Sequence, residues 1–149
     1  MELILVLNGP NLNLLGERDP GHYGSRTLDD VNSEIADLAE QLAVRVVFFQ
    51  SNHEGDLIDR IHAERHSCDG IIINPGALTH YSYAIHDALD AVGIPVVEVH
   101  LSDIYSREEW RRSSVIEPVA WLSVVGKGPD GYLEALRRLV EKLRGPESR

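Results

Sequence analysis

The chain has 149 residues, of which 43% are hydrophobic, and its 14 Lys and Arg against 24 Asp and Glu give a formal net charge of -10. This size and apolar content suit one folded domain, and a strongly acidic surface argues against nucleic-acid and membrane partners, because both present negative charge. A single cysteine, Cys68, excludes an intrachain disulfide and a cysteine zinc site. The sequence shows no signal-peptide pattern and no apolar run near the ~20 residues of a spanning helix, so we expect a cytoplasmic protein.

Short apolar runs rich in Val and Ile alternate along the chain with runs of helical periodicity. The apolar runs are hydrophobic on both sides, which is typical of parallel strands covered by helices on both faces. Thr27 and Asp30 form a capping-box pattern before the first helical run. In chain order, the expected elements are a strand at 3–7, a helix at 28–42, a strand at 44–49, a helix at 54–64, a strand at 70–73, a helix at 81–91, strands at 95–99 and 121–125, and a helix at 131–143.

Repeated strand–helix–strand units with right-handed crossovers produce an open, doubly wound sheet. We therefore expect an α/β fold in three layers, built on a five-stranded parallel sheet of the flavodoxin-like kind. Residues 1–144 are expected to form this single domain, and residues 145–149 a frayed tail. Ligands bind such sheets beyond the carboxyl ends of the strands. The residues that follow the first four strands are polar, so this edge is the candidate site.

Residues 16–24 are too rich in Gly and Pro for a helix, and they indicate either a mobile lid over the crevice or a solvated surface loop. Arg18 and Tyr23 lie on this segment. A tyrosine serves as a base at neutral pH only if its pKa falls from about 10 to about 7, which costs about 4 kcal/mol. One arginine about 4 Å away in a partly excluded site supplies up to about 4 kcal/mol. Tyr23 is therefore a candidate base, and Arg18 a candidate stabiliser of its phenolate.

Two further pairs of side chains stand at spacings that suit chemistry. Glu98 and His100, two apart at a strand end, share a face, and a carboxylate beside an imidazole fixes its tautomer and raises its pKa, which suits His100 to donate a proton. The alternative is an exposed ion pair. Arg107 and Arg111 are four apart in a run of helical type at 106–112, where they hold a carboxylate or favour a phenolate, or merely pair with neighbouring glutamates.

Residues 79–87 follow the third strand and are expected to open a helix, on which His80 and Asp87 share a face that suits a polyhydroxy ligand. The run from Gly126 to Gly131 matches a dinucleotide fingerprint but comes too late in the chain, so we interpret it as a tight turn with Asp130 as a helix cap. The seven histidines form no metal-binding pattern, and we expect no metal.

Several segments together resemble one family, with the right order and spacing from residue 3 to about 140. They are Asn8-Gly9-Pro10-Asn11, the stretch from Arg18 to Tyr23-Gly24, Asn74-Pro75-Gly76-Ala77-Leu78-Thr79-His80, Glu98-Val99-His100-Leu101-Ser102, Arg107-Glu108-Glu109-Trp110-Arg111 and Gly131-Tyr132. The family is the type II 3-dehydroquinate dehydratases. The resemblance implies a flavodoxin-like subunit that removes water from 3-dehydroquinate to give 3-dehydroshikimate, in the shikimate route or in quinate breakdown. It also implies that no cofactor is needed and that subunits assemble as dodecamers of trimers.

The resemblance also implies roles for individual residues. Tyr23 would be the base, with Arg18 and Arg107 supporting its phenolate, and Asn11 would hold a water that supports the enolate oxygen. His100, oriented by Glu98, would protonate the departing hydroxyl. Residues that would grip the substrate are Asn74, His80, Asp87, Leu101, Ser102 and Arg111.

The sequence departs from the family at Ser113, where histidine is common, and at Trp121-Leu122, where a small residue is usual. The other known route to this reaction uses a lysine Schiff base, but Lys127 and Lys142 do not follow a buried strand in the crevice. The competing hypothesis is a non-catalytic flavodoxin-like module that binds a nucleotide or flavin. It requires a phosphate-cradling loop after the first strand, where Pro10 lacks an amide donor.

Overall fold

The computed structural model describes residues 1–18, 21 and 25–145. Its centre is a five-stranded sheet in the order β2-β1-β3-β4-β5, in which every neighbouring pair is parallel. This order is that of flavodoxin-like folds, and each strand lies within one residue of its predicted bounds. The strands are β1 (Leu3–Asn8), β2 (Arg45–Gln50), β3 (Gly70–Asn74), β4 (Val96–His100) and β5 (Leu122–Val125).

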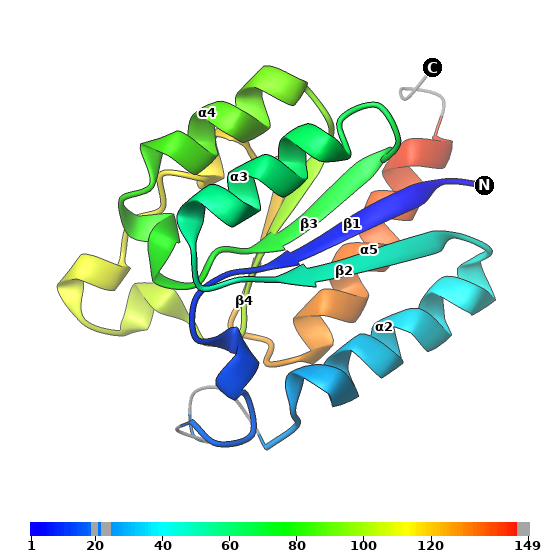
Figure 1. Ribbon diagram of the computed structural model, residues 1–149. Coiled ribbons are helices and arrows are strands. Elements are labelled where there is room, and N and C mark those ends of the chain that lie inside the picture. Colours follow the sequence, from blue (N-terminus) through cyan, green and yellow to red (C-terminus); the bar gives the residue numbers. More distant parts are fainter. Residues whose placement is uncertain (19–20, 22–24, 146–149) are drawn as a thin grey trace.

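Helices cover both faces of the sheet, so the predicted three layers are confirmed. Helices α2 (Leu28–Leu42) and α5 (Asp130–Arg144) lie on one face, and α3 (Glu54–Ala63) and α4 (Tyr83–Val92) lie on the other (Figure 1). Alternate side chains of β1 point to opposite faces: Ile4 packs with the α2 and α5 side, and Leu5 with the α3 and α4 side. The sheet thereby separates two hydrophobic cores, and the loops at its ends are left to carry the site.

The first helix begins where its sequence pattern indicates. Thr27 Oγ1 accepts a hydrogen bond from the Asp30 amide at 3.1 Å, and the Asp30 carboxylate accepts one from the Thr27 amide at 3.0 Å. This reciprocal capping box satisfies two amides that would otherwise lack partners at the helix start. The helix ends at Leu42, and Ala43 after it has left-handed backbone angles.

The segment after β3 differs from its prediction. Residues 76–80 form the 3-10 turn η2 (Gly76–His80), and α4 begins at Tyr83 because the Ser82 hydroxyl caps it by accepting from the Ile85 amide. His80 therefore lies outside α4, whereas Asp87 lies within it. The prediction that the two share a helix face is wrong.

The segment at 106–112 is not one helix. It divides into the 3-10 turns η3 (Ile104–Ser106) and η4 (Glu109–Arg111), because the Asp103 side chain accepts from the Tyr105 amide in a tight turn and Arg107 then adopts extended backbone. Arg107 and Arg111 consequently do not share a helix face.

The start of α5 also differs from its prediction. Asp130 is not the cap of the helix but its first residue, since Pro129 before it already has helical backbone angles. The Asp130 carboxylate instead lies 3.3 Å from Arg26 Nη2.

Candidate functional site

A pocket of about 540 Å³ opens beyond the carboxyl ends of β1, β3 and β4, as the topology predicts. Nine of the predicted site residues line it: Asn11, Arg18, Asn74, His80, His100, Leu101, Ser102, Arg107 and Arg111. The pocket thus brings together residues from four separate segments of the sequence.

Two loops of the pocket touch backbone to backbone. The Gly9 amide donates to the Asn74 carbonyl at 2.8 Å, and a Cβ at Gly9 would lie 2.5 Å from the Pro75 carbonyl oxygen. Gly76 has φ +61°, and a Cβ there would lie 2.9 Å from the carbonyl oxygen of Pro10. Only glycine permits this close approach. The Asn-Gly-Pro and Asn-Pro-Gly sequences therefore serve to join the ends of β1 and β3.

Asn11 takes left-handed backbone angles, with φ 72°, at the start of the 3-10 turn η1 (Leu12–Leu14). Its amide donates to Asn52 Oδ1 at 2.9 Å, and Gln50 Nε2 donates to both the Gly9 carbonyl and Asn52 Oδ1 at 3.2 Å. The polar residues after β2 thus hold the loop after β1 and leave the Asn11 side chain beside the pocket.

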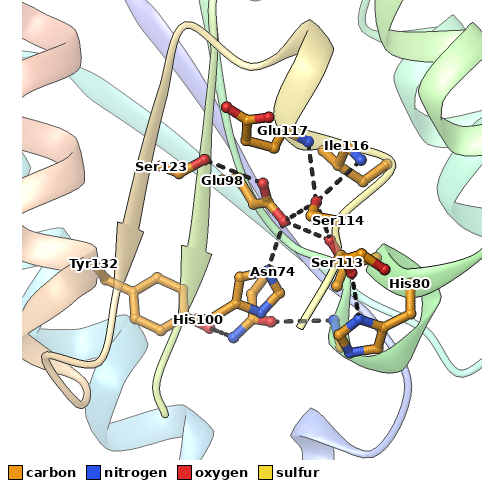
Figure 2. A network of polar contacts seen from close by, with 12 residues as sticks. Asn74, His80, Glu98, His100, Ser113, Ser114, Ile116, Glu117, Ser123 and Tyr132 are labelled. Carbon is orange, nitrogen blue, oxygen red and sulfur yellow. Dashed lines mark hydrogen bonds and ion pairs between the residues drawn. The ribbon is translucent and has the colours of Figure 1, made fainter. Parts of the chain in front are cut away.

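Asn74 is oriented by a buried phenol. Asn74 Nδ2 donates to Tyr132 Oη at 3.0 Å (Figure 2). Tyr132 donates in turn to Asn8 Oδ1 at 2.5 Å, and Asn74 Oδ1 accepts from the Gly76 amide at 3.1 Å. One N–H of Asn74 then remains for a ligand. Burial raises the pKa of Tyr132, which keeps its hydroxyl protonated. Sequence analysis named Tyr132 only within the Gly131-Tyr132 segment of the family resemblance and assigned it no role.

Glu98 and His100 form the most deeply buried charged pair of the site. The carboxylate of Glu98 is 1% exposed, the His100 ring is 5% exposed, and His100 Nε2 lies 2.7 Å from Glu98 Oε2. Burial alone raises the pKa of Glu98, but hydrogen bonds from His100, Thr79 and Ser114 outweigh it and hold the pKa below 4.5. Glu98 is therefore ionised, and it fixes the proton of His100 on Nε2. The predicted pairing is confirmed, and it is buried instead of solvent-facing.

Three hydroxyls that sequence analysis missed surround the Glu98 carboxylate. Thr79, Ser114 and Ser123 all donate to it, from η2, from the loop after η4 and from β5. They lie 16 to 25 residues from Glu98 in sequence. Serine and threonine are common in loops, so no local pattern separates these hydroxyls from others.

Arginines supply the positive charge of the pocket. Arg107 Nη1 donates to Ser102 Oγ at 3.2 Å, and its side chain is 11% exposed. Arg111 Nε donates to Glu108 at 2.7 Å, and its guanidinium group stacks 4.0 Å from the Trp110 ring. With Arg18 on the same pocket wall, three guanidinium groups collect in a chain of net charge -10, an arrangement suited to an anionic ligand.

His80 closes the other side of the pocket as a neutral ring. Its Nδ1 donates to the Ser113 carbonyl at 2.7 Å, and its ring packs edge-on against Trp110. Burial is the main cause that lowers the pKa of His80, and the positive charges of His100 and Arg111 lower it further. His80 Nε2 is then left as a hydrogen-bond acceptor. Ser113 contributes a backbone carbonyl here, so its side chain is not required for this contact.

Three predicted residues are not among those that line the pocket, and one of them, Glu98, lies behind His100. Asp87 is exposed on α4, and Tyr23 lies outside the described residues. Neither lysine lines the pocket: Lys127 pairs with Glu134, and Lys142 lies 5.0 Å from the Trp121 ring. Within residues 1–18, 21 and 25–145, no group of three potential metal ligands occurs, and no helix is long and apolar enough to cross a membrane.

The comparisons with known proteins agree with this geometry. A model of the family "Dehydroquinase class II" matches residues 2–140. The chain belongs to the class II dehydroquinase family. It is 53% identical over 149 residues to a 3-dehydroquinate dehydratase of Bacillus subtilis, with all of both chains covered, and 55% identical over 134 residues to one of Pelotomaculum thermopropionicum, with 90% and 93% covered. The structure is similar to a type II dehydroquinase of Butyrivibrio crossotus, with a TM-score of 0.91, 46% identity, and 93% and 97% of the two chains covered. As a class II dehydroquinase, the protein is an enzyme of the lyase class.

Proposed function

We propose that this protein removes water from 3-dehydroquinate to give 3-dehydroshikimate, by an enolate-type anti elimination that needs no cofactor. The observation that carries the proposal is the buried Glu98–His100 pair, which opens onto the same pocket as three arginines and Asn74. Loss of water from a hydroxyketone requires a base for the carbon–hydrogen bond beside the ketone, a stabiliser for the enolate and an acid for the leaving hydroxyl.

His100 is the acid in this scheme. With Nε2–H held by Glu98, the ring binds a second proton at Nδ1 and becomes imidazolium, which the buried carboxylate stabilises. No residue of the described part of the chain hydrogen-bonds His100 Nδ1. This nitrogen therefore delivers the proton to the departing hydroxyl, and Glu98 remains ionised throughout.

Tyr23 is the base, acting as phenolate. Arg18 and Arg107 are the cations assigned to hold its negative charge, and both line the pocket. Each guanidinium group about 4 Å from the phenolate contributes up to about 4 kcal/mol, which is sufficient to lower a tyrosine pKa to neutrality. Asn11 is assigned to the water that supports the enolate oxygen.

The remaining assigned residues bind substrate. Arg111 is the partner for the substrate carboxylate, because a guanidinium group binds a carboxylate through paired hydrogen bonds. Asn74, His80 Nε2 and the backbone amides of Leu101 and Ser102 are assigned to hydrogen-bond the substrate hydroxyls. The contact assigned to Asp87 has no support from the pocket of a single chain, and Asp87→Asn tests it.

We propose that the reaction serves the shikimate route to aromatic amino acids or quinate breakdown, and that the enzyme works in the cytoplasm. Membership of the family supports the shikimate route. We propose that the functional form is a homo-oligomer, a dodecamer of trimers. Exposed aromatic side chains are consistent with association, since they are enriched at protein–protein interfaces. They are Tyr81, Tyr83, Tyr105, Trp110 and Trp121.

A direct assay tests the proposal. The purified protein is incubated with 3-dehydroquinate, and the ultraviolet absorbance of the conjugated enone product is followed against a Tyr23→Phe control. We expect turnover by the wild type and a loss of at least about a hundredfold in the control, because general base catalysis contributes 10²–10⁴-fold, roughly. A wild-type signal no higher than that of Tyr23→Phe refutes the proposal. A yellow purified protein, or nucleotide binding by calorimetry, favours instead the binding module considered above.

A further inference from the structure

We propose that Thr79 and Ser114 are positioning residues whose hydroxyls keep Glu98 ionised and thereby maintain His100 as the imidazolium that donates a proton from Nδ1. The inference rests on the proposed function, because it assigns these hydroxyls to the acid of that reaction. Neither residue lines the pocket, so they act through Glu98 and not on the substrate.

One oxygen of the Glu98 carboxylate, Oε2, accepts most of the hydrogen bonds that the side chain receives. Glu98 Oε2 lies 2.5 Å from Thr79 Oγ1, 2.7 Å from Ser114 Oγ and 2.7 Å from His100 Nε2 (Figure 2). Oε1 receives a single, longer hydrogen bond of 3.2 Å from Ser123. The oxygen that binds His100 is therefore also the one that the two hydroxyls hold.

The direction of the Ser114 hydroxyl follows from its other partners. Ser114 Oγ accepts from the amide of Ile116 at 3.1 Å and from the amide of Glu117 at 3.0 Å. A hydroxyl has two lone pairs and one proton. Because backbone amides occupy both lone pairs, the proton of Ser114 is left to point at Glu98.

Among the residues that the structure describes, the Thr79 hydroxyl has two acceptors in reach, Ser114 Oγ at 2.9 Å and Glu98 Oε2. Since the lone pairs of Ser114 are occupied, the Thr79 proton also goes to Glu98. Thr79 is fully buried, and its carbonyl accepts from the Val115 amide at 2.7 Å, so the backbone fixes η2 beside the Ser114 loop.

Three protons thus converge on one carboxylate oxygen. Such an oxygen is stabilised as an anion, because charge-assisted hydrogen bonds to the charged form favour it and a proton on that oxygen would meet three donors. The charge of Glu98 acts in turn on the titratable groups of His80 in η2 and Tyr105 in η3, and neither group is altered by changes at Thr79 or Ser114. Without the hydroxyls, the Nε2 proton of His100 moves toward Glu98, and this leaves a neutral ring whose Nδ1–H is a weaker acid for the leaving group.

The test is a set of matched substitutions assayed with 3-dehydroquinate. Thr79→Val keeps the shape of the side chain and removes the hydroxyl, and we expect kcat to fall about 10- to 100-fold, the loss of one hydrogen bond to a charged group, with KM unchanged. Thr79→Ser restores the hydroxyl, and we expect it to recover most of kcat. Ser114→Ala is the second variant, and we expect the same selective loss of kcat.

Ser82→Ala is the matched control, because Ser82 is also a buried hydroxyl that donates to a carboxylate, that of Glu54, but it does not line the pocket. It should leave kcat unchanged. The inference is overturned if folded Thr79→Val and Ser114→Ala retain wild-type kcat, or if Thr79→Ser loses as much activity as Thr79→Val. If the wild type itself does not turn over 3-dehydroquinate, the proposed function fails first, which separates the two outcomes.

Discussion

At the scale of single residues, the phenol of Tyr132 links two asparagines at the ends of neighbouring strands. Tyr132→Phe preserves the ring and leaves Asn74 Nδ2 and Asn8 Oδ1 buried without this partner. We expect a loss of about 1–3 kcal/mol in the free energy of unfolding, measured with urea. We also expect KM to rise, because the Asn74 amide is no longer held.

Tyr81→Phe serves as the control for this change, since Tyr81 is 62% exposed and does not line the pocket. It should alter the unfolding free energy by no more than about 0.5 kcal/mol. A Tyr132→Phe variant that is as stable and as active as Tyr81→Phe would show that the buried hydroxyl has no such role.

The depressed pKa of Glu98 predicts how stability depends on pH. Because its pKa lies below the ordinary 4.5 in the folded state, the carboxylate contributes stability that is fully present above that value and is lost as the pH falls through the folded pKa. Glu98→Gln lacks this contribution. The difference in unfolding free energy between wild type and Glu98→Gln should therefore shrink as the pH is lowered from 5 to about 3 in urea titrations. A difference that stays constant over this range would contradict the prediction, and Glu40→Gln on exposed α2 controls for charge.

At the scale of elements, the close approach of the loops after β1 and β3 decides the shape of the pocket. In Gly9→Ala the new Cβ clashes with the carbonyl oxygen of Pro75. Because a Cβ and a carbonyl cannot rotate away as a flexible side chain can, the backbone itself must shift. We expect a loss of about 1–3 kcal/mol in unfolding free energy and a lower turnover, since Asn11 and Asn74 are displaced.

Gly55→Ala in α3 is the matched glycine substitution, because nothing lies within 4 Å of its Cβ position. It should stabilise the protein by about 0.5–1 kcal/mol, since alanine loses less backbone entropy in a helix. Thermal unfolding of both variants checks the pair. Equal effects of the two substitutions would mean that the loop contact does not constrain the chain.

The elements most accurately predicted from sequence are those whose signal is local. The buried strands read as continuous apolar runs, and the helix at Leu28–Leu42 has its own capping box, so their bounds agree with the structure to within one residue. The 3-10 turns on either side of Arg107 are not predictable from periodicity, because a side-chain hydrogen bond of Asp103 breaks the helical pattern.

The same distinction applies to the site. Topology alone predicts the pocket edge, and adjacency in sequence predicts the Glu98–His100 pair. Tyr132 contacts Asn74 across 58 residues, and Ser114 contacts Thr79 across 35, so their roles depend on tertiary packing that no sequence pattern encodes.

At the scale of the whole molecule, the mass of the particle in solution tests the proposed assembly. We expect sedimentation to give a particle with twelve times the 16.6-kDa mass of the chain, in keeping with its exposed aromatic side chains. A species of 16.6 kDa at micromolar concentration would contradict the proposed assembly.

We propose that His100, held by ionised Glu98, gives its proton to the leaving hydroxyl of 3-dehydroquinate. The most direct measurement compares the turnover number of wild type and His100→Ala, with thermal unfolding of each recorded alongside. We predict that His100→Ala loses roughly 10²–10⁴-fold in kcat, as expected for removal of a general acid, while its cooperative unfolding is retained. Turnover equal to that of the wild type, or a loss of activity matched by loss of the fold, would contradict the claim.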